Sequence, residues 1–347
     1  ENILIITRRN KDMVGAGTSR FDIKTLKTLI QTYGIVLVLI LMIIVISILN
    51  PRFLGLTNIF NVLSQTAIYG ILALGMTFVI TSQGIDLSVG SVLALAGCIM
   101  ASIGQVAGAV PRYFPNLPQM PLIVPILAAL SVGAASGALN GWLISATHIP
   151  PFIATLGMYT VARGLVLVYT GGTPISNLLS GFDVIGQGKL FGYIPVAVLV
   201  YVVMIIISWI LLHNTKFGKA VYALGGNKRA AEISGVNVNK TLIIIYAYCG
   251  LLAGVAAIVY AGRAGSMHPS AATGYELTAI AATTVGGTSH TGGIGTIWGA
   301  VIGALLISVL RNGLTLLSVS SYWQQIAEGV IIVAAVIVDM RKNKGKK

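Results

Sequence analysis

Apolar residues occur along the chain in ten long runs, separated by connectors that contain polar residues, Gly or Pro. A helix needs about 20 apolar residues to cross a bilayer, and most of the runs approach this length. The pattern therefore predicts helices over 33–49, 58–82, 87–109, 121–146, 150–170, 193–212, 241–261, 275–289, 293–315 and 322–338. The run at 275–289 is short for a span.

The composition strengthens this interpretation. Hydrophobic residues make up 56% of the 347 residues and charged residues only 9%, whereas soluble domains are about one quarter charged. A soluble protein of this composition could not cover its apolar surface with polar groups. An ordinary cytosolic enzyme, a disordered chain and a secreted disulfide scaffold are therefore excluded. The sequence predicts an all-α polytopic membrane protein with about ten transmembrane helices.

The net charge of +13 is concentrated beside the apolar runs. Sixteen of the 22 Lys and Arg residues lie in 1–30, 213–240 and 339–347, and ten crossings place these segments on one side. Cytoplasmic loops are enriched in Lys and Arg, so basic residues here set orientation and predict no nucleic-acid partner. We expect a cytoplasmic N-terminal segment, a transmembrane domain with one cytoplasmic loop, and a basic cytoplasmic tail, at 1–30, 31–340 (loop 213–240) and 341–347.

Two connectors resemble each other. Residues 81–90 link the second and third runs, and residues 288–295 link the eighth and ninth. Both connectors are polar, contain Gly and Ser, and fall on the same predicted side of the membrane. This similarity predicts two half-repeats in parallel orientation, each with one anchor helix and four spans, an arrangement that recurs in transporters.

Glycines four residues apart recur in three of the runs. These glycines are Gly133, Gly137 and Gly141, then Gly250 and Gly254, and then Gly295, Gly299 and Gly303. Residues with this spacing share one helix face, and glycine allows two helix backbones to touch in lipid. We therefore expect closely packed helix pairs at these positions.

Polar side chains within or beside the runs are candidates for a translocation pathway, because each is costly in lipid. Asp86 either belongs to such a pathway or caps the helix that starts near Leu87, with Ser88 as helper. Arg163 either pairs across the bundle or extends to the interface. The candidate pathway residues are Asn61, Gln65, Asp86, Asn140, Thr155, Tyr159, Arg163 and Asn312. For any one of them, packing between helices is the competing role.

No metal site or cofactor is predicted. The four His residues lie singly at the ends of runs, no H-E-x-x-H motif occurs, and Cys98 and Cys249 lie within apolar runs. The phosphate-binding pattern G-x-x-x-x-G-K-[ST] is also absent from the sequence. We therefore do not expect this chain to bind and hydrolyse ATP by itself.

The basic loop contains a predicted short helix. Asn227 is placed to cap a helix over 228–234, and Gly235 is placed to end it in the left-handed conformation. Small residues at 230, 231 and 234 lie on or near one face. Such a face suits docking into a groove on a cytoplasmic partner. The alternative is an amphipathic helix that rests on lipid headgroups.

The same loop resembles the cytoplasmic coupling loop of monosaccharide ABC-transporter permeases of the ribose, galactose and xylose type. The matching positions in the loop are Gly226, Asn227, Ala230, Ala231, Ser234, Gly235 and Asn237. Segments 81–91, 151–158, 262–266, 285–296 and 322–325 match the same family in order and spacing, and the resemblance covers about residues 30–340.

The resemblance implies a multi-pass protein of the bacterial inner membrane and several partners. These are a second permease subunit, commonly identical, a separate ABC ATPase that docks on the coupling loop, and an extracytoplasmic sugar-binding protein that delivers a monosaccharide. Related permeases carry nucleosides, an autoinducer sugar or branched-chain amino acids, so these substrates stay open. An ion-coupled secondary transporter is the rival class, but it needs several intramembrane acids, and only Asp86, Glu276 and Glu328 are candidates.

Overall fold

The computed structural model describes residues 23–343, with side chains described for 34–341. The longer helices are α2 (Ile23–Leu49), α3 (Leu56–Thr81), α5 (Ile123–Thr147), α6 (Pro151–Thr170), α8 (Val196–Asn214), α11 (Val238–Ala264), α13 (Ile297–Leu316) and α14 (Ser321–Asn343). The shorter ones are η1 (Pro51–Leu54), α4 (Val89–Ile103), α7 (Ser180–Gly186), α9 (Lys216–Gly226), α10 (Lys228–Ile233) and α12 (Tyr275–Val285). Most of the predicted N-terminal segment, 1–22, and residues 344–347 of the predicted tail lie outside the described residues.

Every predicted apolar run coincides with a helix, which confirms a mostly helical membrane protein. Among the described residues, seven helices are long and apolar enough to cross a membrane, namely α3, α5, α6, α8, α11, α13 and α14. The apolar part of α2, Gly34–Leu49, and helix α4 are shorter, and α12 has only 11 residues. The predicted number of ten spans therefore stays a prediction.

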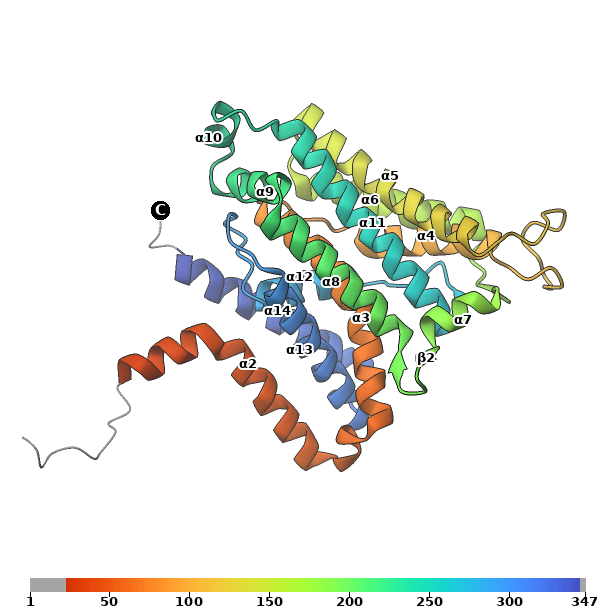
Figure 1. Cartoon of the computed structure of the whole chain (residues 1–347), viewed down its shortest axis with the longest axis horizontal. Coiled ribbons are helices and arrows are strands. Elements are labelled where there is room, and N and C mark those ends of the chain that lie inside the picture. Colours follow the sequence, from red (N-terminus) through yellow and green to blue (C-terminus); the bar gives the residue numbers. More distant parts are fainter. Residues whose placement is uncertain (1–22, 344–347) are drawn as a thin grey trace, which may run out of the picture.

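Very little of the described chain is in strands. Strands β1 (Ile175–Ser176) and β4 (Ser266–Met267) pair antiparallel, and β2 (Lys189–Leu190) and β3 (Ile194–Pro195) form a small hairpin. The hairpin and α7 lie at one end of the bundle, whereas α9, α10 and the C-terminal end of α14 lie toward the other (Figure 1).

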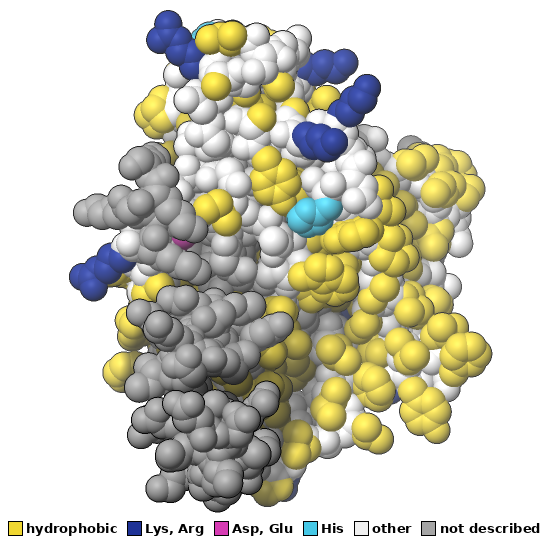
Figure 2. Space-filling model, turned by 60° about the vertical axis from the view of Figure 1, so that its left-hand side comes forward, with side chains coloured by type: hydrophobic (Ala, Val, Ile, Leu, Met, Phe, Trp, Pro, Cys, Tyr) yellow, Lys and Arg dark blue, Asp and Glu magenta, His cyan; other side chains and the backbone are white. Residues whose placement is uncertain are grey.

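Helices α3 and α11 form the centre of the bundle. Within their most apolar windows, 89% of α3 and 72% of α11 are buried, against 6% for α14 and 22% for α6. Helices at the periphery expose apolar side chains over a broad flank, which Figure 2 shows in yellow. Such a surface is what a bilayer requires, since lipid tails are as apolar as the side chains that meet them.

The predicted close contacts are confirmed for the glycines of α5, α11 and α13, whereas Gly295 lies before α13 and an added Cβ there would meet the side chains of Thr81 and Thr288. Helix α5 packs on α11 so closely that a Cβ atom added at Gly133 would lie 2.3 Å from the carbonyl oxygen of Gly250. At Gly137 an added Cβ would lie 2.0 Å from the carbonyl oxygen of Tyr246. Helix α13 meets α12 in the same way, because a Cβ added at Gly303 would lie 1.9 Å from the carbonyl oxygen of Ala282. Only glycine permits these backbone approaches.

The basic residues of the predicted cytoplasmic loop gather at the α9–α10 end of the bundle (Figure 2). The exposed residues are Lys216, Lys219, Lys228, Arg229 and Lys240. The C-terminal end of α14, which carries Arg341, lies toward the same end (Figure 1). The described basic residues therefore gather at one end of the bundle, as the charge pattern predicts, and the side of the membrane that this end faces stays a prediction.

The two similar connectors lie against each other at this end. The Gln83 side-chain amide donates to the carbonyl oxygen of Thr291 at 2.7 Å, and the Gly293 N–H donates to the carbonyl oxygen of Thr81 at 2.8 Å. The contact joins the end of α3 to the loop before α13. The internal duplication itself stays a prediction.

Candidate coupling helix and outer cavity

The short helix expected in the basic loop is present as α10. Asn227 Oδ1 accepts from the Ala230 N–H at 3.0 Å, which caps the N-terminus as predicted. Gly235 ends the helix with φ +87°, a conformation that favours glycine. Asn237 then caps α11, because its Oδ1 accepts from the Lys240 N–H at 2.9 Å. Asn227, Gly235 and Asn237 therefore shape the loop through local backbone contacts.

One part of the expected docking face needs correction. Ala231 is only 5% exposed and lies on the side of α10 that packs against its own chain. It therefore cannot seat directly in a groove on a partner. Ala230 and Ser234 are exposed, and the large apolar side chain of Ile233 is 81% exposed. The exposed Ile233 is not indicated by the pattern of small residues in the sequence.

Helix α9 was not expected from the sequence, and it holds α10 against the bundle. Its buried residues recur at helical spacing, at Gly218, Val221, Leu224 and Gly225. A Cβ added at Gly225 would lie 1.8 Å from the carbonyl oxygen of Thr81 and 2.4 Å from the nitrogen of Gly293. Gly226, one of the positions that resemble the family's coupling loop, is less crowded than Gly225, because an added Cβ there would have no atom within 4 Å.

A tyrosine adds a second tie between α9 and the loop before α13. The Tyr222 hydroxyl donates to the carbonyl oxygen of Gly295 at 2.7 Å. Burial raises the pKa of this hydroxyl, so it stays protonated and able to donate. Tyr222 and Gly225 therefore connect α9 to the end of α3 and to the loop before α13.

Three of the candidate pathway residues meet around the connector after α3. Asp86 is 1% exposed, and its Oδ1 accepts from the N–H and the hydroxyl of Ser88 at 2.8 and 2.6 Å. Asn140 of α5 donates to the Ser88 hydroxyl at 3.0 Å, and the Thr155 hydroxyl donates to the carbonyl oxygen of Ile85 at 3.2 Å. These bonds fix the turn before α4. The N-cap residue of α4 is Ser88, and no side chain caps the first turn of this helix, so Asp86 braces the turn and does not have the capping role considered for it.

Arg163 and Tyr159 lie one turn apart on α6, away from this cluster. The Arg163 guanidinium donates to the carbonyl oxygens of Pro269 and Ala271 at 2.5 and 3.1 Å. It therefore pairs across the bundle, with backbone rather than with an acid, and holds the segment between β4 and α12. Tyr159 is half-buried.

The remaining candidates lie in the half of the bundle opposite the basic loop. Asn61 is exposed on α3, one turn before Gln65 on the same face. Asn312 of α13 exchanges two hydrogen bonds of 2.9 Å with Asn58, which the sequence did not suggest. The eight candidates are therefore spread over several separate contacts, and their role in a translocation pathway stays a prediction.

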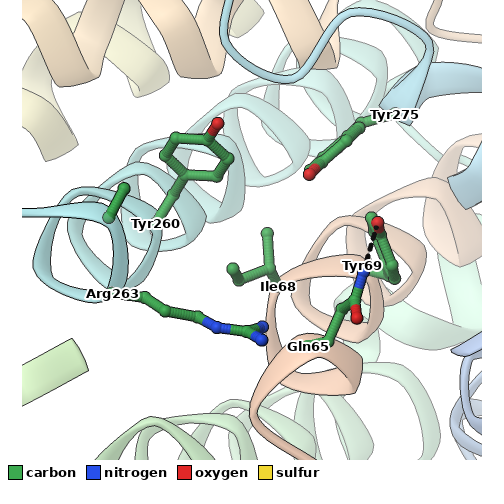
Figure 3. Close-up of a pocket in the computed structure, with 7 residues that line it drawn as sticks. Gln65, Ile68, Tyr69, Tyr260, Arg263 and Tyr275 are labelled. Carbon is green, nitrogen blue, oxygen red and sulfur yellow. Dashed lines mark hydrogen bonds between the residues drawn. The ribbon is translucent and has the colours of Figure 1, made fainter. Parts of the chain in front are cut away.

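Gln65 borders a cavity of about 270 Å³ between α3, α11 and the start of α12 (Figure 3). Its side chain donates to the Tyr69 hydroxyl at 3.0 Å. The Arg263 side chain extends from α11 toward α3, and the Tyr275 hydroxyl points into the space between the other two tyrosines. The lining residues are Gln65, Ile68, Tyr69, Tyr260, Arg263, Ala264 and Tyr275.

An ion pair supports one wall of this cavity. Arg311 of α13 donates to the Tyr69 hydroxyl at 2.7 Å and to the Thr278 hydroxyl at 3.0 Å, and it pairs with Glu328 of α14 at 2.5 Å. Its guanidinium carbon also lies 5.0 Å from the centroid of the Tyr69 ring. Arg311 and Glu328 in turn line a second cavity of about 450 Å³ against α14.

A family model described as "Branched-chain amino acid transport system / permease component" matches residues 58–336. The chain belongs to this permease family. It is 44% identical over 309 residues to the ribose import permease protein RbsC of Escherichia coli (strain K12), covering 88% of this chain and 92% of that protein. The RbsC protein of Bacillus subtilis (strain 168) is 45% identical over 315 residues, covering 90% and 94%.

The galactose/methyl galactoside import permease protein MglC of E. coli (strain K12) is 37% identical over 335 residues, covering 95% of this permease and all of MglC. No solved structure matches the chain. The family matched by the comparisons confirms the resemblance inferred from the loop and connector motifs. The described residues contain no cluster of His, Cys, Asp or Glu that could hold a metal ion.

Proposed function

We propose that this permease is the membrane subunit of an ATP-driven importer in the bacterial inner membrane. It moves a monosaccharide that an extracytoplasmic binding protein delivers. Two copies form the transport unit, and a separate ABC ATPase docks on the α9–α10 loop from the cytoplasm. Each copy crosses the membrane ten times, with α2, α4 and α12 completing the seven longer spans, and consists of two parallel half-repeats.

The observation that carries this proposal is the shape and position of α10. It is a capped helix at the basic end of the bundle, and Ile233 projects from it with 81% of its surface exposed. A large exposed apolar side chain on a rigid element is a common anchor in protein interfaces. Ala230 and Ser234 lie exposed beside it and permit a partner to approach closely.

The cavity bordered by Gln65 and Arg263, called the outer cavity from here on, fits a sugar better than a branched-chain amino acid. Among the described residues that line the cavity, Arg263 is charged and none is a carboxylate. An amino acid brings an ammonium group that needs a negative or strongly accepting partner. A neutral sugar needs donors and acceptors for its hydroxyls, and the amide, guanidinium and phenol groups supply them. The related ribose and galactose import permeases point to the same substrate class.

The ion-coupled alternative is less well supported. Asp86, Glu276 and Glu328 are each buried, but they lie in separate contacts. Asp86 is held by Ser88, Glu328 is paired with Arg311, and Glu276 accepts from the Gly274 N–H at 3.2 Å. A proton or ion relay needs such groups to follow one another along a path.

Ile233→Asp tests the docking role of α10. The charged side chain would remove the apolar anchor without disturbing the caps of the helix, so the ATPase should fail to co-purify with the permease. Phe191→Asp is the matched control, because Phe191 is 83% exposed at the opposite end of the bundle. We expect normal ATPase recovery with the control. If Ile233→Asp retains the ATPase and supports normal uptake, α10 rests on lipid headgroups instead.

A further inference from the structure

We infer that the cavity between α3, α11 and α12 is a binding site for one monosaccharide ring within the permease itself. Tyr260 and Tyr275 would contact the apolar face of the ring, and Gln65 and Arg263 would bind its hydroxyls. The inference rests on the proposed function for its substrate class. It adds a site inside the permease, at which the sugar pauses after it leaves the binding protein.

The size of the cavity sets the first limit. A volume of about 270 Å³ holds roughly nine water molecules at liquid density, which suits a pentose or a hexose and is small for a disaccharide. The walls come from three helices, so the relative positions of the lining side chains depend on packing rather than on a loop. Small-ligand sites are usually largely preformed in this way.

The aromatic residues supply the second argument. The rings of Tyr69 and Tyr275 have centroids 4.8 Å apart at 70°, and those of Tyr260 and Tyr275 lie 6.2 Å apart at 66°. Tyr275 thus connects three rings into one aromatic wall (Figure 3). An aromatic ring with a hydroxyl offers both an apolar surface and a polar tip, as a sugar does.

The polar residues supply the third argument. Arg263 is half-buried and forms no ion pair with any described residue, so its donors are available to a ligand. Gln65 already donates one hydrogen bond to Tyr69, which leaves its carbonyl oxygen as an acceptor on the cavity side. Arg263 and Gln65 therefore offer both donors and an acceptor without a net negative charge.

Arg311 is a positioning residue for this site. It does not line the cavity, but it donates to the Tyr69 hydroxyl and lies over the Tyr69 ring. Tyr69 is 2% exposed and accepts from both Gln65 and Arg311, so its side chain cannot swing to another χ1 rotamer without breaking two bonds. The wall that the sugar meets is therefore rigid before the sugar arrives.

The site lies where an incoming sugar arrives first. Tyr260 and Arg263 occupy the last turns of α11, whereas the start of α11 follows the basic α9–α10 loop. In the proposed orientation, the cavity is in the outer half of the membrane.

Equilibrium binding tests the inference. The nucleotide-free permease–ATPase complex in lipid nanodiscs, without binding protein, is titrated with radiolabelled ribose, galactose and leucine. We expect saturable binding of at least one of the two sugars and none of leucine. Arg263→Gln and Tyr260→Ala should each weaken it about tenfold, the loss expected for one charge-assisted bond or one aromatic contact. Tyr193→Ala, at an exposed tyrosine in the β2–β3 turn, should bind as the wild type does.

The outcomes separate the site from the function. If the wild-type complex transports sugar but retains none, or if Arg263→Gln and Tyr260→Ala both bind normally, the inference is overturned and the proposed function stands. If leucine binds and neither sugar does, the monosaccharide function itself is wrong. Nucleotide hydrolysis by each variant complex shows that it is folded, and Arg263→Gln keeps the test valid if Tyr260→Ala is unstable.

Discussion

A single methyl group at Gly225 would test how α9 and α10 are connected to the transmembrane helices. Gly225→Ala changes no charge and lies outside every apolar run. An ideal Cβ at this position would lie 1.8 Å from the carbonyl oxygen of Thr81 and 2.4 Å from the nitrogen of Gly293. Both are backbone atoms, so no side chain can turn away to make room.

The distances allow an estimate of the effect. Non-bonded atoms normally stay about 3.5 Å apart, so α9 must move by about 1.7 Å from Thr81. Overpacking of this kind costs about 1–3 kcal/mol, and the Tyr222–Gly295 hydrogen bond lost by the shift adds about 1 kcal/mol. Replacing Gly by Ala in a helix returns about 0.5–1 kcal/mol. We therefore expect a net destabilisation of about 2 kcal/mol, confined to the α9 contact.

The assay has two readouts, thermal unfolding of the purified permease and ATP-driven sugar uptake by the assembled importer. Gly225→Ala should still insert, should unfold at a lower temperature, and should lose most of its uptake because α10 is displaced. Gly164→Ala on α6 is the matched control, since an added Cβ there has no atom within 4 Å. Gly226→Ala should have a smaller effect than Gly225→Ala. Wild-type unfolding and uptake in Gly225→Ala would refute the close contact.

Three further outcomes are expected. Glu328→Gln should lower the stability by about 3 kcal/mol in a denaturation assay, because it leaves the charge of Arg311 without its partner; unchanged stability would argue against the pair. Burial lowers the pKa of His290 in the folded protein, so the unfolded chain binds a proton at this residue more readily than the folded one. The thermal stability should therefore fall as the pH drops below about 6.5, the ordinary pKa of histidine. The variant His290→Gln should lose less stability over the same pH range. A membrane-impermeant thiol reagent should label a Cys introduced at Lys189 in intact cells but not one at Lys228, and the reverse pattern would overturn the orientation.

Features with local causes could be predicted from the sequence. The bounds of α10 follow from an Asn that caps it and a Gly that ends it, and both signals lie within a few residues of the helix. The close helix pairs follow from glycines at a spacing of four, because that spacing defines one helix face. The apolar runs locate the longer helices because the bilayer fixes both their length and their composition.

Features that depend on distant contacts could not be predicted. Helix α9 contains Gly218, Gly225 and Gly226, which lower its helix propensity, and its packing against distant segments compensates for this. Ala231 looks like a docking contact by its size, yet it is buried within the chain. The partners of Arg163 are carbonyl oxygens more than 100 residues away, and no sequence pattern marks them.

The outer cavity also could not be predicted from the sequence, because its lining residues come from distant segments. Gln65 was among the candidate pathway residues, but Tyr260 and Tyr275 were not. Tyrosines near helix ends are common in membrane proteins, so their positions in the sequence do not mark a site. Only the crossing of α3, α11 and α12 brings these side chains together. Single polar residues in the sequence therefore identify candidates, and the fold decides which of them share a site.

The most direct measurement is uptake of radiolabelled sugar into proteoliposomes that contain this permease, with its ATPase and its binding protein added singly and together. We predict ATP-dependent accumulation of a monosaccharide only when both partners are present, and none by the permease alone on a proton or sodium gradient. Accumulation by the permease alone on an ion gradient, without ATPase or binding protein, would contradict its assignment as an ABC importer subunit.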